Sequence, residues 1–173
     1  MKPLRIPAPK RPGESTFIVM CETLALIDLA EAGALDRLLP ANSHATFVVP
    51  DLLMVELRSL GTSAAIQVIE WLRKHRIEII ATEMHAEYLQ LLAYKPTVKS
   101  NKYVSMATEE MLSDCLGLGI EGTTHQGVAY VPGNHAIVVL RDEAVRNMPF
   151  LSRASRYISF VTVSEVVRGL MTS

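Results

Sequence analysis

From residue 16 onward, the chain alternates short apolar runs with amphipathic segments. Apolar runs bounded by turn residues are typical of strands that are buried on both faces of a parallel sheet. Five segments have this pattern: residues 16–21, 45–49, 77–81, 136–140 and 157–163. Strands that alternate with helical patterns predict an α/β fold, here a three-layer α/β/α sandwich around a mainly parallel sheet of about five strands.

The segments between the strands have apolar residues at helical spacing. Ala65, Val68, Ile69 and Leu72, for example, fall on one helical face. Gly33 and Gly61 are expected stop signals, and Thr82 is an expected helix cap. The expected helices span residues 22–33, 34–39, 51–60, 62 or 63 to 73, 82–94, 106–118 and 164–170, with a polar loop over 95–105.

The chain is expected to form one folded domain with an extension in front of it. Residues 1–15 form a basic arm with four prolines, which cannot make a helix. Residues 16–173 form the domain, which is long enough to bury a substantial core. A glycine-rich insertion at 117–134 interrupts it and is expected to hold a small hairpin around 127–131.

Composition argues for an ordinary globular protein. Apolar residues make up 49% of the chain and charged residues 20%, and the formal net charge is -1. No global positive field would therefore attract nucleic acid, so any contact with RNA has to come from a local patch. Two basic clusters could supply one, although solvated surface explains each of them as well: residues 73–76, and Lys95, Lys99 and Lys102.

Cysteine usage and hydropathy indicate a reducing compartment. Cys21 and Cys115 lie in apolar contexts without metal-type spacing, as buried thiols do. No apolar run approaches the roughly 20 residues of a membrane span, so we expect a cytoplasmic protein. The five histidines show no zinc-type spacing and are expected at the surface or in loops, whereas Trp71 and Tyr88 are expected in the core or at a subunit interface.

Three acidic residues follow apolar runs at or near their carboxyl ends: Glu22, Glu56 and Asp142. Open α/β sheets bind ligands outside the carboxyl ends of their strands. Carboxylates gathered there would hold a divalent cation, because hard cations prefer oxygen ligands. A simpler interpretation makes Glu22 a first-turn helix acid and Asp142 a turn or cap residue.

Several other chemistries are excluded by missing motifs. No GxGxxG follows the first strand, no GxxxxGK[ST] occurs anywhere, and no GxSxG is present. These absences argue against a dinucleotide-binding domain, a P-loop NTPase and an α/β hydrolase.

The acids lie in segments that resemble a known family. IVMCETLALIDLAEAGALDRLL (18–39) resembles the opening of PIN-domain proteins, metal-dependent ribonucleases that include many toxins of bacterial toxin–antitoxin pairs. FVVPDLLMVELRSLG (47–61), VVLRDEAVRN (138–147) and ISFVTVSEVVRGL (158–170) are similar to later blocks of that family. The resemblance covers about residues 17–60 and 136–170.

The resemblance implies a fold, a site and partners. It implies Mg²⁺ or Mn²⁺ held by Glu22, Asp114 and Asp142, with Glu56 orienting water and Thr23 supporting a ligand carboxylate. Glu110 is the alternative to Asp114 as third acid. It also implies RNA as substrate, an antitoxin or other protein partner, and a homodimer.

One residue departs from the family pattern. The family has an aspartate where this chain has Glu22, whose extra methylene moves its oxygens by roughly an ångström or more. A degenerate PIN-like domain that binds RNA or protein without cleaving is therefore the alternative function. An unrelated phosphotransfer or receiver-type α/β domain is a third hypothesis, but it needs a lysine after a late strand, and Arg146 is no good substitute.

Overall fold

The computed structural model describes residues 16–116, 135–141 and 158–171. The elements in chain order are β1 (Thr16–Met20), α1 (Thr23–Glu31), α2 (Leu35–Ala41), β2 (Thr46–Pro50), α3 (Asp51–Leu60), α4 (Ser63–Lys74), β3 (Glu78–Ile80), α5 (Glu83–Tyr94), α6 (Asn101–Leu116), β4 (His135–Leu140), β5 (Ile158–Thr162) and α8 (Val163–Met171). The arm at 1–15, the insertion at 117–134 with its expected hairpin, and Asp142 lie outside the described residues.

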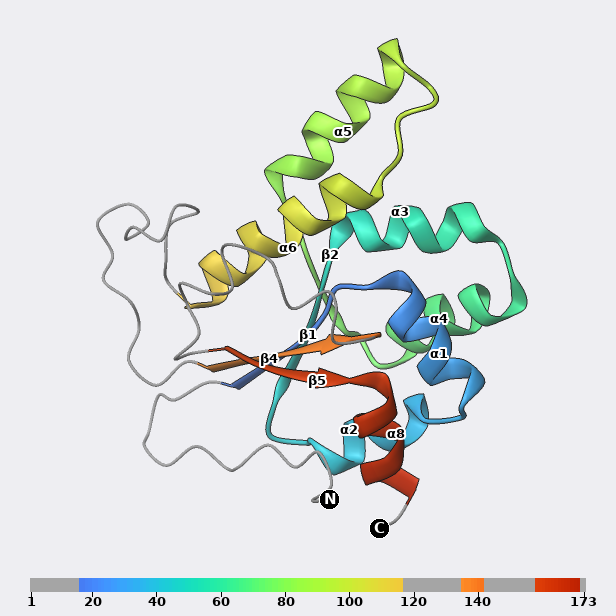
Figure 1. The fold of residues 1–173 in the computed structure, drawn as a ribbon, viewed down its shortest axis with the longest axis vertical. Coiled ribbons are helices and arrows are strands. Elements are labelled where there is room, and N and C mark those ends of the chain that lie inside the picture. Colours follow the sequence, from blue (N-terminus) through green and yellow to red (C-terminus); the bar gives the residue numbers. More distant parts are fainter. Residues whose placement is uncertain (1–15, 117–134, 142–157, 172–173) are drawn as a thin grey trace.

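The strands form one five-stranded sheet in the order β3-β2-β1-β4-β5, and every pairing between them is parallel. β1 lies at the centre, where Ile18 pairs with Phe47 of β2 and with Ile137 of β4. The predicted α/β class, strand number and parallel sheet are confirmed. Because all strands run the same way, their carboxyl ends meet at one edge of the sheet (Figure 1).

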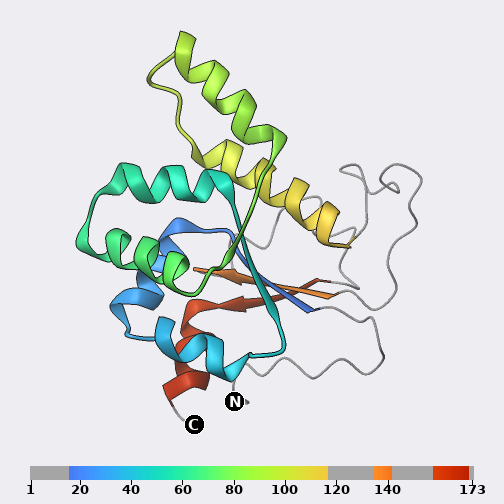
Figure 2. The same ribbon diagram turned by 180° about the vertical axis from the view of Figure 1, so that it is seen from behind.

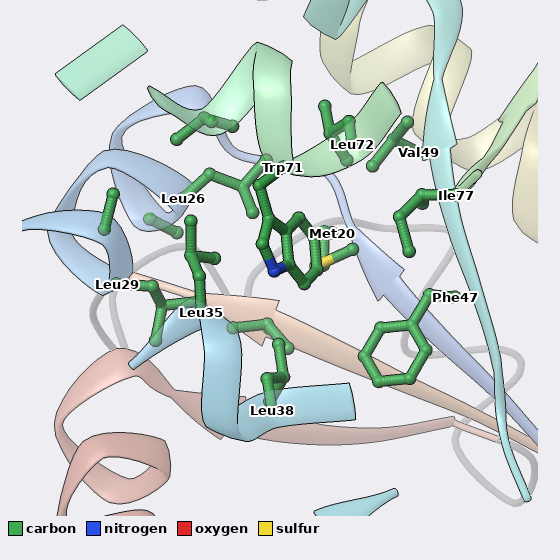
Figure 3. Close-up of a cluster of buried hydrophobic side chains, with 14 of the residues drawn as sticks. Met20, Leu26, Leu29, Leu35, Leu38, Phe47, Val49, Trp71, Leu72 and Ile77 are labelled. Atoms are coloured by element: carbon green, nitrogen blue, oxygen red, sulfur yellow. The ribbon is translucent and has the colours of Figure 1, made fainter. Parts of the chain in front are cut away.

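Helices cover both faces of the sheet, as Figure 2 shows from behind. On one face, Met20 and Val49 pack with Leu26, Trp71 and Leu72 of the covering helices (Figure 3). On the other face, Val19 and Val138 pack against Met111 and Leu112 of α6. Alternate strand residues thus enter opposite cores, which explains why β1, β2 and β4 are nearly continuous apolar runs.

Two helices end where glycine predicted an end. The N–H of Ala34 bonds to the carbonyl of Leu29 and that of Gly33 to Ala30, and Gly33 has φ 65°. These are the two bonds of a Schellman cap. Gly61 caps α3 in the left-handed conformation, with φ 59°.

One helical prediction was wrong in detail. Helix α6 begins at Asn101, whereas the sequence was expected to remain loop to 105. The polar run before it obscured the helical spacing of Val104, Ala107 and Met111, which are all buried. α5 projects from the body of the domain, and the chain then returns to α6, which lies along the body (Figure 1); Tyr88 of α5 is in contact with Tyr103 of α6.

Candidate functional site

The candidate site lies at the carboxyl edge of the sheet. Glu22 comes two residues after β1 and is the residue that precedes helix α1. Its extended backbone (φ -111°, ψ 121°) makes it the N-cap, yet its side chain makes no capping hydrogen bond. Instead, Oε1 of Glu22 accepts a hydrogen bond of 3.2 Å from the backbone N–H of Arg141, which directly follows β4. Glu22 therefore lies at a helix terminus, as the simpler interpretation held, and it also contacts the end of β4.

Two hydroxyl groups hold the carboxylate of Glu56. Thr23 donates to its Oε1 at 2.9 Å, and Ser100 donates to its Oε2, also at 2.9 Å. Thr23 begins α1 and Ser100 immediately precedes α6, so three helices meet around this one carboxylate. Each oxygen retains acceptor capacity, since a carboxylate oxygen has two lone pairs.

Arg141 lies against the acids of this edge. Its Nε donates to Oδ2 of Asp28 at 2.9 Å, and the arginine side chain is 50% exposed. The ion pair ties the end of β4 to helix α1. Together with the bond to Glu22, it connects the end of β4 to the segment that follows β1.

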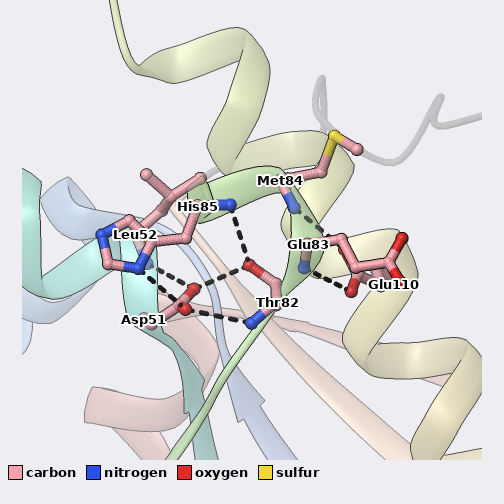
Figure 4. A network of polar contacts seen from close by, with 7 residues as sticks. All are labelled: Asp51, Leu52, Thr82, Glu83, Met84, His85 and Glu110. Carbon is pink, nitrogen blue, oxygen red and sulfur yellow. Dashed lines mark hydrogen bonds and ion pairs between the residues drawn. The ribbon is translucent and has the colours of Figure 1, made fainter. Parts of the chain in front are cut away.

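A second polar cluster joins the ends of β2 and β3 (Figure 4). Asp51, the first residue of α3, accepts hydrogen bonds from Leu52 N–H, from the N–H and hydroxyl of Thr82, and it lies 3.0 Å from Nδ1 of His85. Thr82 also caps α5 through His85 N–H, as predicted. Four donors around one carboxylate make this cluster a fixed joint between the two strand ends.

Glu110 belongs to this joint. Its two oxygens accept the N–H groups of Glu83 and Met84, at 2.7 and 3.3 Å (Figure 4). These N–H groups lie in the first turn of α5, which has no partners of its own for them. Glu110 therefore has a structural role at the start of α5.

Only part of the predicted metal site can be compared with the structure. Glu22 and Thr23 follow β1, and Glu56 lies in α3, the helix that follows β2. Asp142 and the side chain of Asp114 are outside the described part of the chain. Among the residues that are described, no three His, Cys, Asp or Glu side chains are grouped as a metal ion would need.

The thiol of Cys21, the residue before Glu22, is buried. Burial raises the pKa of Cys21 to about 12, and the neighbouring charge of Glu22 adds to the shift. A hydrogen bond with Thr108 opposes it. The thiol is therefore a protonated core group at neutral pH, as the sequence predicted.

Sequence reasoning missed several residues. Ser100 occupies the position before a helix, where serine is common, but the helix was expected to start later. Two of the histidines that were expected at the surface or in loops lie in regular elements and are partly buried: His85 is in α5 and bound to Asp51, and His135 is in β4, where Nε2 is 2.9 Å from Ser159 Oγ and burial lowers its pKa. The prediction for Trp71 and Tyr88 is confirmed, because both are buried.

Comparisons with known proteins find a likeness in structure and none in sequence. No family model matches the chain, and no curated protein matches it in sequence. Among solved structures, the PIN domain of T. brucei RRP44 aligns with 93% of this chain and 83% of its own, at 13% identity and a TM-score of 0.45. A likeness of this degree does not assign the chain to a family. Within the described residues, no helix is long and apolar enough to cross a membrane.

Proposed function

We propose that this protein is a metal-dependent ribonuclease of PIN type that cleaves single-stranded RNA at the carboxyl edge of its sheet. The observation that carries the proposal is the hydrogen bond from Thr23 to Glu56. It joins the residue after Glu22 to a second acid from a different helix, so two carboxylates serve one edge. The resemblance of the surrounding segments to PIN-domain proteins supports the choice of chemistry.

The donor set fits a hard divalent cation, because carboxylate oxygens are the ligands that Mg²⁺ prefers, and Mn²⁺ likewise suits them. Glu22, Asp114 and Asp142 would hold it. Such a cation supplies neutralisation of phosphodiester charge and activation of a water molecule. Glu22 has one oxygen engaged by the N–H of Arg141, which fixes the direction of its carboxylate.

Glu56 has a different role in this proposal. Its two oxygens are each held by a hydroxyl, from Thr23 and from Ser100. A carboxylate fixed in this way can accept a hydrogen bond from the attacking water and orient it towards the phosphorus. Thr23 and Ser100 are then positioning residues, since they act through Glu56.

We also propose that the protein has a protein partner and forms a homodimer. A toxin role would require an antitoxin or other protein that covers the acidic edge, and a homodimer would bury apolar surface. Leu89 and Tyr94 of α5 and Met106 of α6 are exposed and offer such surface. Light scattering on the purified protein, with and without substitution of Tyr94 by serine, measures whether a dimer forms there.

The central experiment measures metal binding and cleavage in one set of proteins. Calorimetry with Mn²⁺ and incubation with a single-stranded RNA pool are applied to the unchanged chain and to a Glu22→Gln, Asp142→Asn double variant. The unchanged chain is expected to bind Mn²⁺ and to cleave, and the double variant to do neither. Glu31→Gln is the matched control, because Glu31 is exposed at the far end of α1.

The alternative function is a domain that binds RNA or protein without cleaving it. The bond between Glu22 and the Arg141 N–H favours this alternative. Glu22 is the acid that differs from the family pattern, and one of its oxygens already has a protein partner. If the unchanged chain binds no metal and cleaves no faster than the double variant, the nuclease proposal is refuted and this alternative stands. Glu22→Asp is the complementary variant: a gain in Mn²⁺ affinity would show a site weakened by the extra methylene.

A further inference from the structure

We propose that Arg141 binds a backbone phosphate of single-stranded RNA at the carboxyl edge. The inference rests on the proposed function for its substrate class, but it does not depend on cleavage. It gives the edge a cation of its own in a chain whose net charge is -1. The ligand group is the phosphodiester, so no base sequence is implied.

The position of Arg141 is fixed at the site. It directly follows β4, which pairs with β1 over the register from Thr16↔His135 to Met20↔Val139. Its backbone N–H donates to Glu22 at 3.2 Å. A polyanion that reaches the carboxylate of Glu22 therefore passes within reach of the arginine side chain.

The guanidinium is oriented by a single contact. Its Nε donates to Oδ2 of Asp28 at 2.9 Å, and within the described part of the chain this is its one ion pair or hydrogen bond. A guanidinium has five N–H donors in a planar fork. With Nε engaged, the face formed by the two terminal nitrogens remains, and that face matches two oxygens of a phosphate.

The positive charge of Arg141 offsets the negative charge of the carboxylates near it. Glu22, Asp28 and Glu56 would repel RNA from the edge, since each adds a negative charge where a negative backbone must approach. The simpler interpretation is that Arg141 only pairs with Asp28 in a surface ion pair. At 50% and 29% exposure of the two side chains, such a pair contributes little to stability. The two interpretations differ in what happens to RNA affinity when each partner is changed.

The test measures binding of a fluorescent single-stranded RNA oligonucleotide by anisotropy, in EDTA so that no cleavage occurs, over a series of salt concentrations. Arg141→Gln is expected to weaken binding about fivefold to tenfold and to lower the slope of log affinity against log salt by about 0.7, the value for one phosphate contact with a single strand. Asp28→Asn is expected to strengthen binding, because it removes a competing anion and keeps an acceptor for Nε. Circular dichroism checks that each variant is folded.

Arg168→Gln is the matched control. Arg168 is exposed in the last turn of α8, which follows the carboxyl end of β5 and runs back from it, so it lies away from the carboxyl edge, and its loss changes net charge by the same amount. It is expected to leave affinity and slope unchanged. Equal effects of the two arginine variants, an unchanged affinity of Arg141→Gln, or no RNA binding by the unchanged chain would each overturn the inference.

A separate assay with Mn²⁺ distinguishes this inference from the proposed function. RNA binding that depends on Arg141, without cleavage, would retain the inference and refute the nuclease. Cleavage by the unchanged chain together with normal binding by Arg141→Gln would do the reverse.

Discussion

The hydroxyl of Thr23 donates a 2.9 Å hydrogen bond to Oε1 of Glu56, across 33 positions of the sequence. Ser100 holds the other oxygen of the same carboxylate, 44 positions away. Three helices therefore converge on one acid at the carboxyl edge. The hydroxyl groups of Thr23 and Ser100 together hold the carboxylate more firmly than either hydroxyl would alone.

Removal of these hydroxyls should reduce RNA cleavage more than stability. Thr23→Val and Ser100→Ala are each expected to lower kcat in the presence of Mn²⁺ about 10-fold to 100-fold, as loss of a group supporting a ligand does. Each should cost only about 1 kcal/mol of unfolding free energy, since one hydrogen bond is lost. Single-turnover kinetics and urea denaturation measure the two effects. Ser59→Ala is the control, because the Ser59 hydroxyl bonds to the carbonyl of Val55 on the exposed side of α3.

Substitution of Asp51 should be one of the most destabilising changes of a polar residue in this protein. Asp51→Ala removes the acceptor for Thr82 and for His85 and leaves their donors without it, so unfolding free energy should fall by about 3 kcal/mol. Urea denaturation measures the change. Asp36→Ala, at an exposed position in the first turn of α2, should cost less than about 1 kcal/mol. Equal costs at the two positions would contradict the joint between β2 and β3.

Substitution of Glu110 should affect the stability of α5, whereas substitution of Asp114 should affect metal binding. Glu110→Ala removes the acceptor for the Glu83 and Met84 N–H groups, so amides in the first turn of α5 should exchange faster with solvent. Its Mn²⁺ affinity should not change. Asp114→Asn should do the opposite. Hydrogen exchange and calorimetry on both variants would reveal a reversed assignment of the third acid.

Cys21 should make stability depend on alkaline pH. Its pKa is raised from 9.0 to about 12 by burial, so the folded state resists losing the thiol proton. The stabilisation is fully present below pH 9, and it declines as the unfolded thiol ionises between pH 9 and about 12. Cys21→Ala has no thiol to ionise, so its stability should fall less between pH 8 and pH 10.5. Parallel slopes for the two proteins in urea denaturation would contradict the burial of the thiol.

The two faces of α3 should respond differently to truncation. Leu53 is fully buried, and Leu53→Ala should cost about 2–5 kcal/mol through lost burial and a cavity. Leu60 is 44% exposed, and Leu60→Ala should change stability by about 0.5 kcal/mol at most. Thermal and urea denaturation of the matched pair measure both. A large cost at Leu60 would indicate that a partner surface buries it.

Most of the fold could be predicted because its signals are local. Predominantly apolar runs marked all five strands, and Gly33 and Gly61 marked helix ends through their left-handed backbone. The start of α6 could not be found in this way. Its first residues are polar, and the buried spacing of Val104 and Ala107 becomes visible only when the helix packs on α3 and α5.

The candidate site was predictable only where strand ends carried acids. Glu22 follows an apolar run, and Glu56 lies in the helix after the next strand, so the parallel sheet was enough to place both at one edge. Ser100 and His85 carry no such signal. A serine or a histidine takes part in a site only through the partner that faces it, and that partner is distant in sequence.

The sequence alone thus determined the α/β class and the parallel strands, because apolar runs are read residue by residue. Tertiary structure alone decided which side chains hold the acids of the candidate site. Thr23 and Ser100 meet Glu56, and Arg141 meets Glu22 and Asp28, because β4 pairs with β1 and α6 crosses the opposite face of the sheet from α1. Hydrogen bonds reach only about 3 Å, so their partners are fixed by packing between distant segments and not by the pattern within any one of them.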